Sequence, residues 1–320
     1  MKVVFGGQIA RPPVLAMLRK FHGIELVEAD EVSDVAPHVA GADVLVIANP
    51  RGKQGAALAE ALRRPDSKVR WIQVVSAGID GLTAHGIPQG IRVTNQGGAA
   101  APAVAEHAMG LLLALCRRID LACIDTAAAA WNAERIRTLT RSVEGSTVGI
   151  VGMGNIGRET ARRLRAFGAV VVGFSRDGEA REGADRMHRL GDLAQVAGEL
   201  DAIVVCLALV EATHHLVDAE VLAQCKPSCL LVNVSRGEVV DGAALESALR
   251  AGKLAGAALD VTKPEPLPAS STLWQAPNLI ITPHIAATGN KLVGRRIAGV
   301  VEENLRRFID GRPLLNEVTT

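Results

Sequence analysis

One segment constrains the fold of this chain more than any other: the run Thr147–Gly157, which reads TVGIVGMGNIG. An apolar, β-branched stretch leads directly into three glycines, and a helical pattern of apolar residues follows them. In order, such glycines serve a tight turn, a close approach of the backbone to a pyrophosphate, and close packing of a helix on a strand. The start of the helix then presents N–H groups to the phosphates. We therefore predict a dinucleotide-binding unit. The predicted contacts in this loop are Gly152, Met153, Gly154, Asn155, Ile156 and Gly157.

Short β-branched runs alternate with helical patterns along the rest of the chain, which is typical of parallel sheets flanked by helices. Two strand series are separated by a helix expected from about residue 103 to 118, and a last helix is expected from 291 to 310. We predict an α/β protein with two Rossmann-like or flavodoxin-like domains and an active-site cleft between them. Because the last helix follows the second series, we expect it to pack back on the first. The substrate domain is then residues 1–99 with 288–320, and the NAD(P)-binding domain is residues 100–287. A further helix is expected at Thr126–Ala130, followed by a connecting arm.

Composition excludes several classes of partner. The 35 basic and 34 acidic residues nearly balance, and there is no Tyr, which argues against a nucleic-acid surface. No apolar run approaches the ~20 residues that span a bilayer, and the N-terminus does not read as a signal peptide. Five cysteines occur without a CxxC pair, so we expect reduced, mostly buried thiols and no metal site. A soluble cytoplasmic enzyme fits this pattern.

Cofactor choice is set where the strand after the glycine loop ends, here at Ser175-Arg176. An NAD enzyme usually carries an acidic residue there, which bonds the ribose hydroxyls. A serine does not repel a 2′-phosphate, and the planar guanidinium of Arg176 can pair with one. We predict NADP(H) in preference to NAD(H). The alternative is that Arg176 is a solvated surface residue and that Asp177 reaches the ribose.

Three later strand-to-loop segments supply residues suited to reducing a 2-keto acid: Arg236, Glu265 and His284. In a parallel sheet, all three lie near the carboxyl ends of strands, where ligands bind. The substrate carboxylate needs a cation, best supplied by an arginine. The carbonyl oxygen needs a proton donor, for which histidine is best suited near neutral pH. The donor in turn needs a carboxylate that orients it, which is the role expected of Glu265.

These segments resemble the signatures of the D-isomer-specific 2-hydroxyacid dehydrogenase family, and the similarity runs from about Val69 onward. By this resemblance, Trp71–Asp80 is the carboxylate-binding loop, whose amides at Ala77, Gly78 and Ile79 act with Arg236. Ala103–His107 is similar to the start of the family's interdomain helix. The resemblance also implies a homodimer built through the cofactor domain and an arm near Trp131. Further cofactor contacts are expected at Ser175, Arg176, Leu207, Ala208, Thr213, Val234, Ser235, Arg236, Asp260 and His284.

The chain departs from the family in places. Ala208 stands where Pro is frequent, and Ser175 replaces the usual Asp. Glu265 stands where formate dehydrogenases of this fold carry Gln, which argues against formate. No additional regulatory domain is expected after the last helix. Arg51 follows an early strand and could line the mouth of the substrate site, or could be a loop cation.

The function predicted on these grounds is hydride transfer between NAD(P)H and a small 2-keto acid or its D-2-hydroxy acid. Glyoxylate and hydroxypyruvate are favoured because Ser175-Arg176 resembles the NADPH-linked reductases of the family. Two alternatives stay open: a dinucleotide-sensing, corepressor-like binding protein, and a phosphonate-type dehydrogenase on the same fold. Neither the substrate nor the physiological direction is fixed by sequence.

Overall fold

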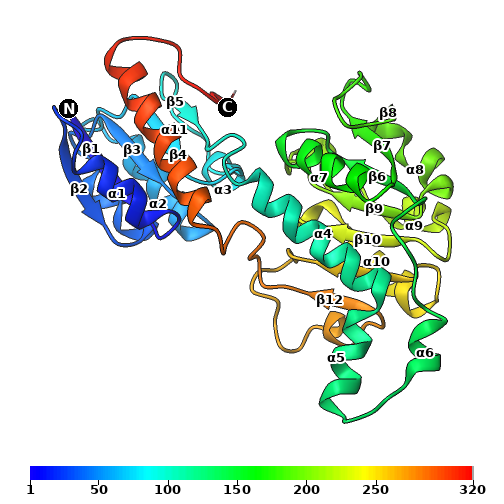
Figure 1. Cartoon of the computed structure of the whole chain (residues 1–320). Coiled ribbons are helices and arrows are strands. Elements are labelled where there is room, and N and C mark those ends of the chain that lie inside the picture. The colour runs from blue at the N-terminus through cyan, green and yellow to red at the C-terminus, as the bar shows by residue number, and fades with distance from the viewer. Residues whose placement is uncertain (319–320) are drawn as a thin grey trace. The chain divides into compact units, whose positions relative to one another are not determined.

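The computed structural model describes residues 1–318 and divides the chain into two compact units (Figure 1). Unit 1 is Met1–Ala100 together with Gly289–Thr320, and unit 2 is Ala101–Thr288. Each division lies one residue later than the expected domain boundary. No helix in the described range is both long and apolar enough to cross a membrane.

Unit 1 is built on a five-stranded parallel sheet with the order β2-β1-β3-β4-β5. Buried, β-branched residues dominate the central strands, as expected for a sheet covered on both faces. The last helix packs against α1, and Asn304 on it donates to Gln73 Oε1 at 2.9 Å, so the chain returns to unit 1 at its end. The strands are β1 (Lys2–Gly6), β2 (Glu25–Ala29), β3 (Val44–Ile47), β4 (Trp71–Val74) and β5 (Arg92–Thr94). The helices are α1 (Arg11–Leu18), α2 (Lys53–Leu62), α3 (Asp80–Thr83) and α11 (Lys291–Ile309).

Unit 2 contains a seven-stranded parallel sheet with the order β12-β11-β10-β9-β6-β7-β8. The order reverses between β6 and β9, and ligands of open α/β sheets bind at the carboxyl ends of strands beside such a reversal. The strands are β6 (Thr147–Val151), β7 (Val170–Ser175), β8 (Arg186–Arg189), β9 (Ala202–Val205), β10 (Leu230–Asn233), β11 (Gly256–Leu259) and β12 (Leu279–Ile281). The helices are α4 (Ala101–Arg117), α5 (Ile119–Ala127), α6 (Ala133–Arg137), α7 (Asn155–Ala166), α8 (Leu193–Val196), α9 (Ala219–Gln224) and α10 (Gly242–Arg250). The predicted α/β class with two parallel sheets is confirmed.

One local expectation is wrong. The helix expected at Thr126–Ala130 is the end of α5, which stops at Ala127, and Ala129 has φ +50°. The carboxylate of Asp125 accepts hydrogen bonds from Asn132 and Arg135, and these contacts hold the chain in a turn before α6 begins. α5 and α6 together project away from the sheet of unit 2 (Figure 1).

Candidate active site

The glycine loop joins β6 to α7 at the strand reversal, and each of its three glycines has a different surrounding that explains why glycine stands there. Gly152 has φ +107°, and a Cβ on it would lie 2.7 Å from the Cβ of Leu207. A Cβ on Gly157 would lie 2.1 Å from the carbonyl oxygen of Gly152, so helix and strand touch there. A Cβ on Gly154 would meet nothing within 4 Å. The backbone at Gly154 is therefore open to close approach, which is the condition that a pyrophosphate-binding glycine has to meet.

The backbone N–H groups in the first turn of α7 are available to bind a ligand. Gly154 at its N-cap provides no side-chain cap, and within residues 1–318 no partner accepts from the N–H groups of Asn155, Ile156 or Gly157. Such N–H groups bind phosphate oxygens well. Below the loop, Cys206 donates to Gly152 O at 3.4 Å, and burial raises the pKa of that thiol to about 12. Cys206 is therefore a neutral supporting group and not a nucleophile.

The end of β7 forms a polar turn in which Asp177 is held by its neighbours. Ser175 Oγ donates to Asp177 Oδ1 at 2.8 Å, and the N–H of Glu179 donates to the same oxygen at 3.0 Å. Arg181 pairs with the other carboxylate oxygen at 2.6 Å. The hydrogen bond from Ser175, followed by that from Glu179, lowers the pKa of Asp177 to about 2. Arg176 is exposed at the same turn.

His284 and Glu265 form a pair at the loops after β12 and β11. His284 Nδ1 lies 2.8 Å from Glu265 Oε2, with 35% of the His284 side chain and 21% of the Glu265 side chain exposed. The other oxygen of Glu265 accepts from the N–H of Thr262 at 3.2 Å. Because Glu265 occupies Nδ1, Nε2 is the nitrogen that can serve a substrate. The predicted donor and its orienting carboxylate are thus in hydrogen-bond contact.

Arg236 follows β10 in a loop that packs tightly on the loop of Glu265. A Cβ on Gly237 would lie 2.2 Å from the carbonyl carbon of Thr262, so only glycine permits this approach of two backbones. Buried Asn233 shapes the turn: it donates to Arg236 O at 2.9 Å and accepts from Ser235 Oγ at 2.7 Å. The structure therefore brings the Arg236 loop and the Glu265 loop together.

Asp260 organises the loop that carries His284. The Asp260 side chain is 1% exposed, and its oxygens accept from the N–H groups of Ile285 at 2.9 Å and Ala286 at 3.0 Å. Its backbone carbonyl accepts from the N–H of His284 at 2.8 Å. His284 itself has φ +55°, an uncommon conformation for a non-glycine residue that local contacts must support. Sequence reasoning placed Asp260 near the cofactor but missed this bracing role.

The loop after β9 runs over the glycine loop. Leu207 lies against Gly152, while Ala208 is exposed. The buried hydroxyl of Thr213 donates toward Ala208 O at 2.9 Å and accepts from the N–H of Val210 at 2.8 Å. Thr213 therefore braces this loop from inside. On the neighbouring strand, Val234 continues β10 by donating to Val205 O at 3.1 Å.

In unit 1, the predicted carboxylate loop follows β4. Ser76 Oγ donates to Gly78 O and Asn95 donates to Ala77 O, both at 2.9 Å. Within residues 1–318, the N–H groups of Ala77, Gly78 and Ile79 donate to no partner. Successive N–H groups of this kind are suited to an anion. Arg51 lies exposed on the separate loop after β3.

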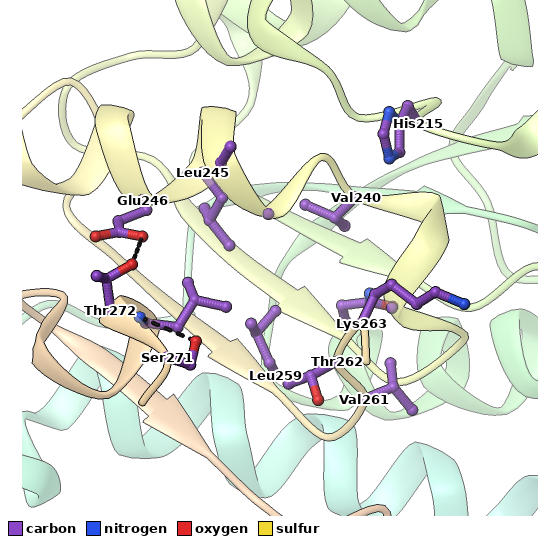
Figure 2. A pocket seen from close by; sticks show the side chains of 15 residues that line it. His215, Val240, Leu245, Glu246, Leu259, Val261, Thr262, Lys263, Ser271 and Thr272 are labelled. Atoms are coloured by element: carbon purple, nitrogen blue, oxygen red, sulfur yellow. Dashed lines mark hydrogen bonds between the residues drawn. The ribbon is translucent and has the colours of Figure 1, made fainter. Parts of the chain in front are cut away.

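A pocket of about 310 Å³ lies beside the Glu265 loop within unit 2 (Figure 2). Its lining residues come from α10, from the ends of β10 and β11, and from the segment 262–273, together with His215, Gly237 and Val240. Two of the lining residues are hydrogen-bonded to each other, with Thr272 donating to Glu246 at 2.6 Å, and Lys263 pairs with Glu238 at 2.7 Å. Arg236, Glu265 and His284 do not line this pocket, although its wall includes Thr262, which supports Glu265. No cluster of residues suited to a metal ion occurs in the described part of the chain.

The chain is similar to a known protein family in both sequence and structure. Residues 109–286 match the family model described as D-isomer specific 2-hydroxyacid dehydrogenase, NAD binding domain. A glyoxylate reductase/hydroxypyruvate reductase of Mus musculus is 37% identical over 228 residues, which cover 70% of each chain.

Two solved structures extend the likeness over nearly the whole chain. A D-isomer specific 2-hydroxyacid dehydrogenase family protein from Aeromonas salmonicida superposes with a TM-score of 0.85 at 32% identity, covering 99% of this chain and 98% of that one. An NADPH-dependent glyoxylate/hydroxypyruvate reductase from Sinorhizobium meliloti, in complex with NADP and malonate, gives a TM-score of 0.78 at 28% identity over 99% and 96% of the two chains. The fold, the glycine loop and these matches lead to one conclusion: the chain belongs to the D-isomer specific 2-hydroxyacid dehydrogenase family.

Proposed function

We propose that this protein reduces a small 2-keto acid to the D-2-hydroxy acid, with His284 as the proton donor. The observation that carries the proposal is the 2.8 Å contact between His284 Nδ1 and Glu265 Oε2, on loops at the carboxyl edge of a sheet that also holds the glycine loop. A dinucleotide loop and a histidine–carboxylate pair at one sheet edge are what this reaction needs. Family membership supports the same class of oxidoreductase.

The residues of the chain divide the chemistry among them. When bound, the nicotinamide cofactor supplies the hydride. The Arg236 guanidinium pairs with the substrate carboxylate and draws electron density from the carbonyl. His284 delivers a proton from Nε2 to the carbonyl oxygen, while Glu265 accepts the Nδ1–H bond and stabilises the charged ring. Asp260 keeps the His284 backbone in place through the loop amides.

Substrate binding also uses backbone groups of unit 1. We assign the N–H groups of Ala77, Gly78 and Ile79 to the substrate carboxylate, because they are consecutive and donate to no partner within residues 1–318. We assign Arg51 to the substrate side group, which its exposure and its place after β3 support. The names of two relatives, a glyoxylate/hydroxypyruvate reductase in each case, favour glyoxylate or hydroxypyruvate as the substrate.

For the cofactor we propose NADPH. Three groups are assigned to its phosphates and ribose: the N–H groups of the first turn of α7, the hydroxyl of Ser175, and the guanidinium of Arg176. The alternative assignment of Asp177 to the ribose is less favoured, because the acidic ribose contact usually stands at the end of this strand, and β7 ends at Ser175, two residues before Asp177. The NADPH dependence stated for the Sinorhizobium relative is consistent with this choice. The remaining contacts are proposed at Leu207, Ala208, Thr213, Val234, Ser235, Arg236, Asp260 and His284.

The test is a steady-state panel on purified protein. Glyoxylate, hydroxypyruvate, pyruvate and a bulkier 2-keto acid are each assayed with NADPH and with NADH. We expect turnover of glyoxylate or hydroxypyruvate, with a higher kcat/KM for NADPH than for NADH. Turnover with a preference for NADH contradicts the cofactor assignment alone. No turnover with any pair, combined with tight NADPH binding, contradicts the enzymatic proposal and favours a dinucleotide-sensing protein.

We also propose a homodimer formed through the α5–α6 arm. Large apolar side chains are exposed along this arm: Trp131 is 94% exposed and Ile124 is 61% exposed. Exposed apolar residues gathered on one projecting segment are typical of a protein interface. Light scattering on the Trp131→Ser/Ile124→Ser variant should give the monomer mass where the wild type gives twice that mass. A monomeric wild type at micromolar concentration contradicts the proposal.

We place the enzyme in a reducing compartment such as the cytoplasm. Its five cysteines are all free thiols, and Cys116, Cys206, Cys225 and Cys229 are buried. Unpaired thiols are typical of proteins kept under reducing conditions. Fluorescence imaging of the tagged protein in its host tests this assignment, and a signal outside the cytoplasm contradicts it.

A further inference from the structure

His107 makes polar contacts that its place on a largely apolar helix does not predict. It lies on α4, which packs against α7, β10 and β11. Its Nε2 atom is 3.0 Å from Thr282 Oγ1 and 3.3 Å from Asp260 Oδ1, and 21% of its side chain is exposed. Thr282 and Asp260 both belong to the hydrogen-bond network that holds the loop carrying His284. The direction of the hydrogen bond between His107 and Thr282 therefore decides what His107 contributes to that loop.

The ionised state of Asp260 determines which atom is the donor in the hydrogen bond between His107 Nε2 and Thr282 Oγ1. Burial by itself would raise the pKa of Asp260, but hydrogen bonds from His107, Thr282 and the amides of Ile285 and Ala286 hold it below its ordinary value. An ionised carboxylate only accepts, so the hydroxyl proton of Thr282 goes to Asp260 Oδ1, at 2.6 Å. Toward His107 the hydroxyl can then only accept. His107 must therefore carry a proton on Nε2 and donate it into this pair.

The groups that receive this proton hold the catalytic loop. Asp260 accepts from Thr282, from the N–H of Ile285 and from the N–H of Ala286, and these residues flank His284. The Nε2–H of His107 is the donor that α4 contributes to this arrangement. Without it, the Thr282 oxygen loses its donor, and the Asp260–Thr282 pair loses its link to the helix.

We propose that His107 is a positioning residue for the proton donor: it fixes Thr282 and Asp260, and through them the loop that presents His284. This inference rests on the proposed role of His284. Misplacing a reacting group by about 1 Å can lower a rate by about 100-fold. Loss of the His107 contact should therefore act mainly on kcat, while KM and the Kd for NADPH change little.

The variants follow from the geometry. His107→Leu keeps an apolar body and removes the donor. His107→Gln keeps an amide N–H at about the reach of Nε2 and is the conservative rescue. Glu106→Gln is the matched control, because Glu106 is an exposed neighbour on the same helix. We expect kcat to fall by about 10- to 100-fold in His107→Leu. We expect His107→Gln to stay within a few-fold of the wild type, and Glu106→Gln to equal it.

A double-mutant cycle separates positioning from general damage. Each change is made in the wild type and in His284→Ala, and single-turnover oxidation of NADPH is followed with enzyme in excess. If His107 acts through His284, His107→Leu slows the wild type but adds no further loss in His284→Ala. Equal losses in both backgrounds, no loss in the wild type, or Gln performing as poorly as Leu each overturn the proposal.

Thr282→Val provides a second route if His107→Leu fails to fold. It removes the hydroxyl through which His107 acts and preserves the side-chain shape, and Thr282→Ser is its conservative partner. The same cycle with His284→Ala applies, with the same supporting and overturning results. Failure of the proposed function is distinguishable, because it is seen as an unimpaired rate in His284→Ala alone, whatever residue stands at position 107.

Discussion

His284 Nδ1 and Glu265 Oε2 are 2.8 Å apart, and each of the two residues is also fixed through other atoms. Glu265 accepts from the Thr262 N–H through its second oxygen, and the His284 N–H donates to Asp260 O. The ring is therefore oriented before any substrate binds. Preorganisation of this kind lets a general acid work without spending binding energy on its own alignment.

The first prediction separates the charge of Glu265 from its hydrogen bond. Glu265→Gln leaves an amide oxygen that can accept from His284 Nδ1–H but carries no charge, whereas Glu265→Ala removes both. We expect kcat for the 2-keto acid to fall about 10-fold in the Gln variant and about 100-fold or more in the Ala variant. Steady-state kinetics measures both. Equal rates for Glu265→Ala and the wild type would contradict the orienting role.

The second prediction concerns cofactor choice at the end of β7. Arg176→Ala should lower kcat/KM for NADPH by about 10- to 100-fold, the size of a charge-assisted contact, and leave NADH unchanged. Ser175→Asp should reverse the preference, because a carboxylate repels the 2′-phosphate and bonds a ribose hydroxyl. Arg162→Ala is the matched control, since Arg162 is an exposed cation on α7 that pairs with Glu159. Equal effects on both cofactors would contradict the assignment.

The third prediction contrasts two glycines of one loop. A methyl group at Gly154 meets open space, so Gly154→Ala should fold normally yet raise the Kd for NADPH at least about 10-fold by obstructing the pyrophosphate. A methyl group at Gly157 would collide with Gly152 O, so Gly157→Ala should lose about 1–3 kcal/mol of stability or more. Thermal unfolding and fluorescence titration distinguish them. A stable Gly157→Ala protein would show that the helix can move away from the strand.

The fourth prediction is the pH dependence of stability due to Asp260. Its pKa in the folded protein lies below its ordinary value, so its ionised form stabilises the fold above about pH 4, near the unfolded value. This contribution is lost as pH falls through the folded value. Asp260→Asn should be less stable at pH 7 by about 1–3 kcal/mol, because its amide cannot accept every bond. Denaturant unfolding should show that the difference in free energy of unfolding between Asp260→Asn and the wild type becomes smaller below pH 4. A difference in free energy of unfolding that does not change with pH would contradict a stabilising role for the ionised Asp260 carboxylate.

The sequence alone predicts those strands and helices that have a clear local pattern of apolar residues. Most strands of both parallel sheets are apolar and β-branched, and β6 is the apolar stretch that leads into the glycine loop. β8 (Arg186–Arg189) carries no apolar pattern by which to predict it, because it is a polar strand that pairs with β7 at the edge of the sheet. The helix expected at Thr126–Ala130 ends at Ala127 because the turn that follows depends on side-chain contacts of Asp125 rather than on helix propensity.

The same limit applies to the candidate site. Arg236, Glu265 and His284 each follow a strand of a parallel sheet, so their common edge could be predicted from sequence. The His107–Thr282–Asp260 contacts join distant segments, and no spacing in the sequence encodes them. The engagement of Asp177 by Ser175 and Arg181 is likewise visible only once the turn after β7 is built.

The most direct test of the account is the rate of His284→Ala with the preferred 2-keto acid and NADPH. We predict a kcat lower by about 10²- to 10⁴-fold, the usual contribution of a general acid, while the Kd for NADPH changes only a few-fold because His284 is one of many proposed cofactor contacts. His214→Ala, at an exposed histidine of the same unit, is the matched control and should keep the wild-type kcat. Undiminished turnover in His284→Ala would show that this residue does not protonate the substrate.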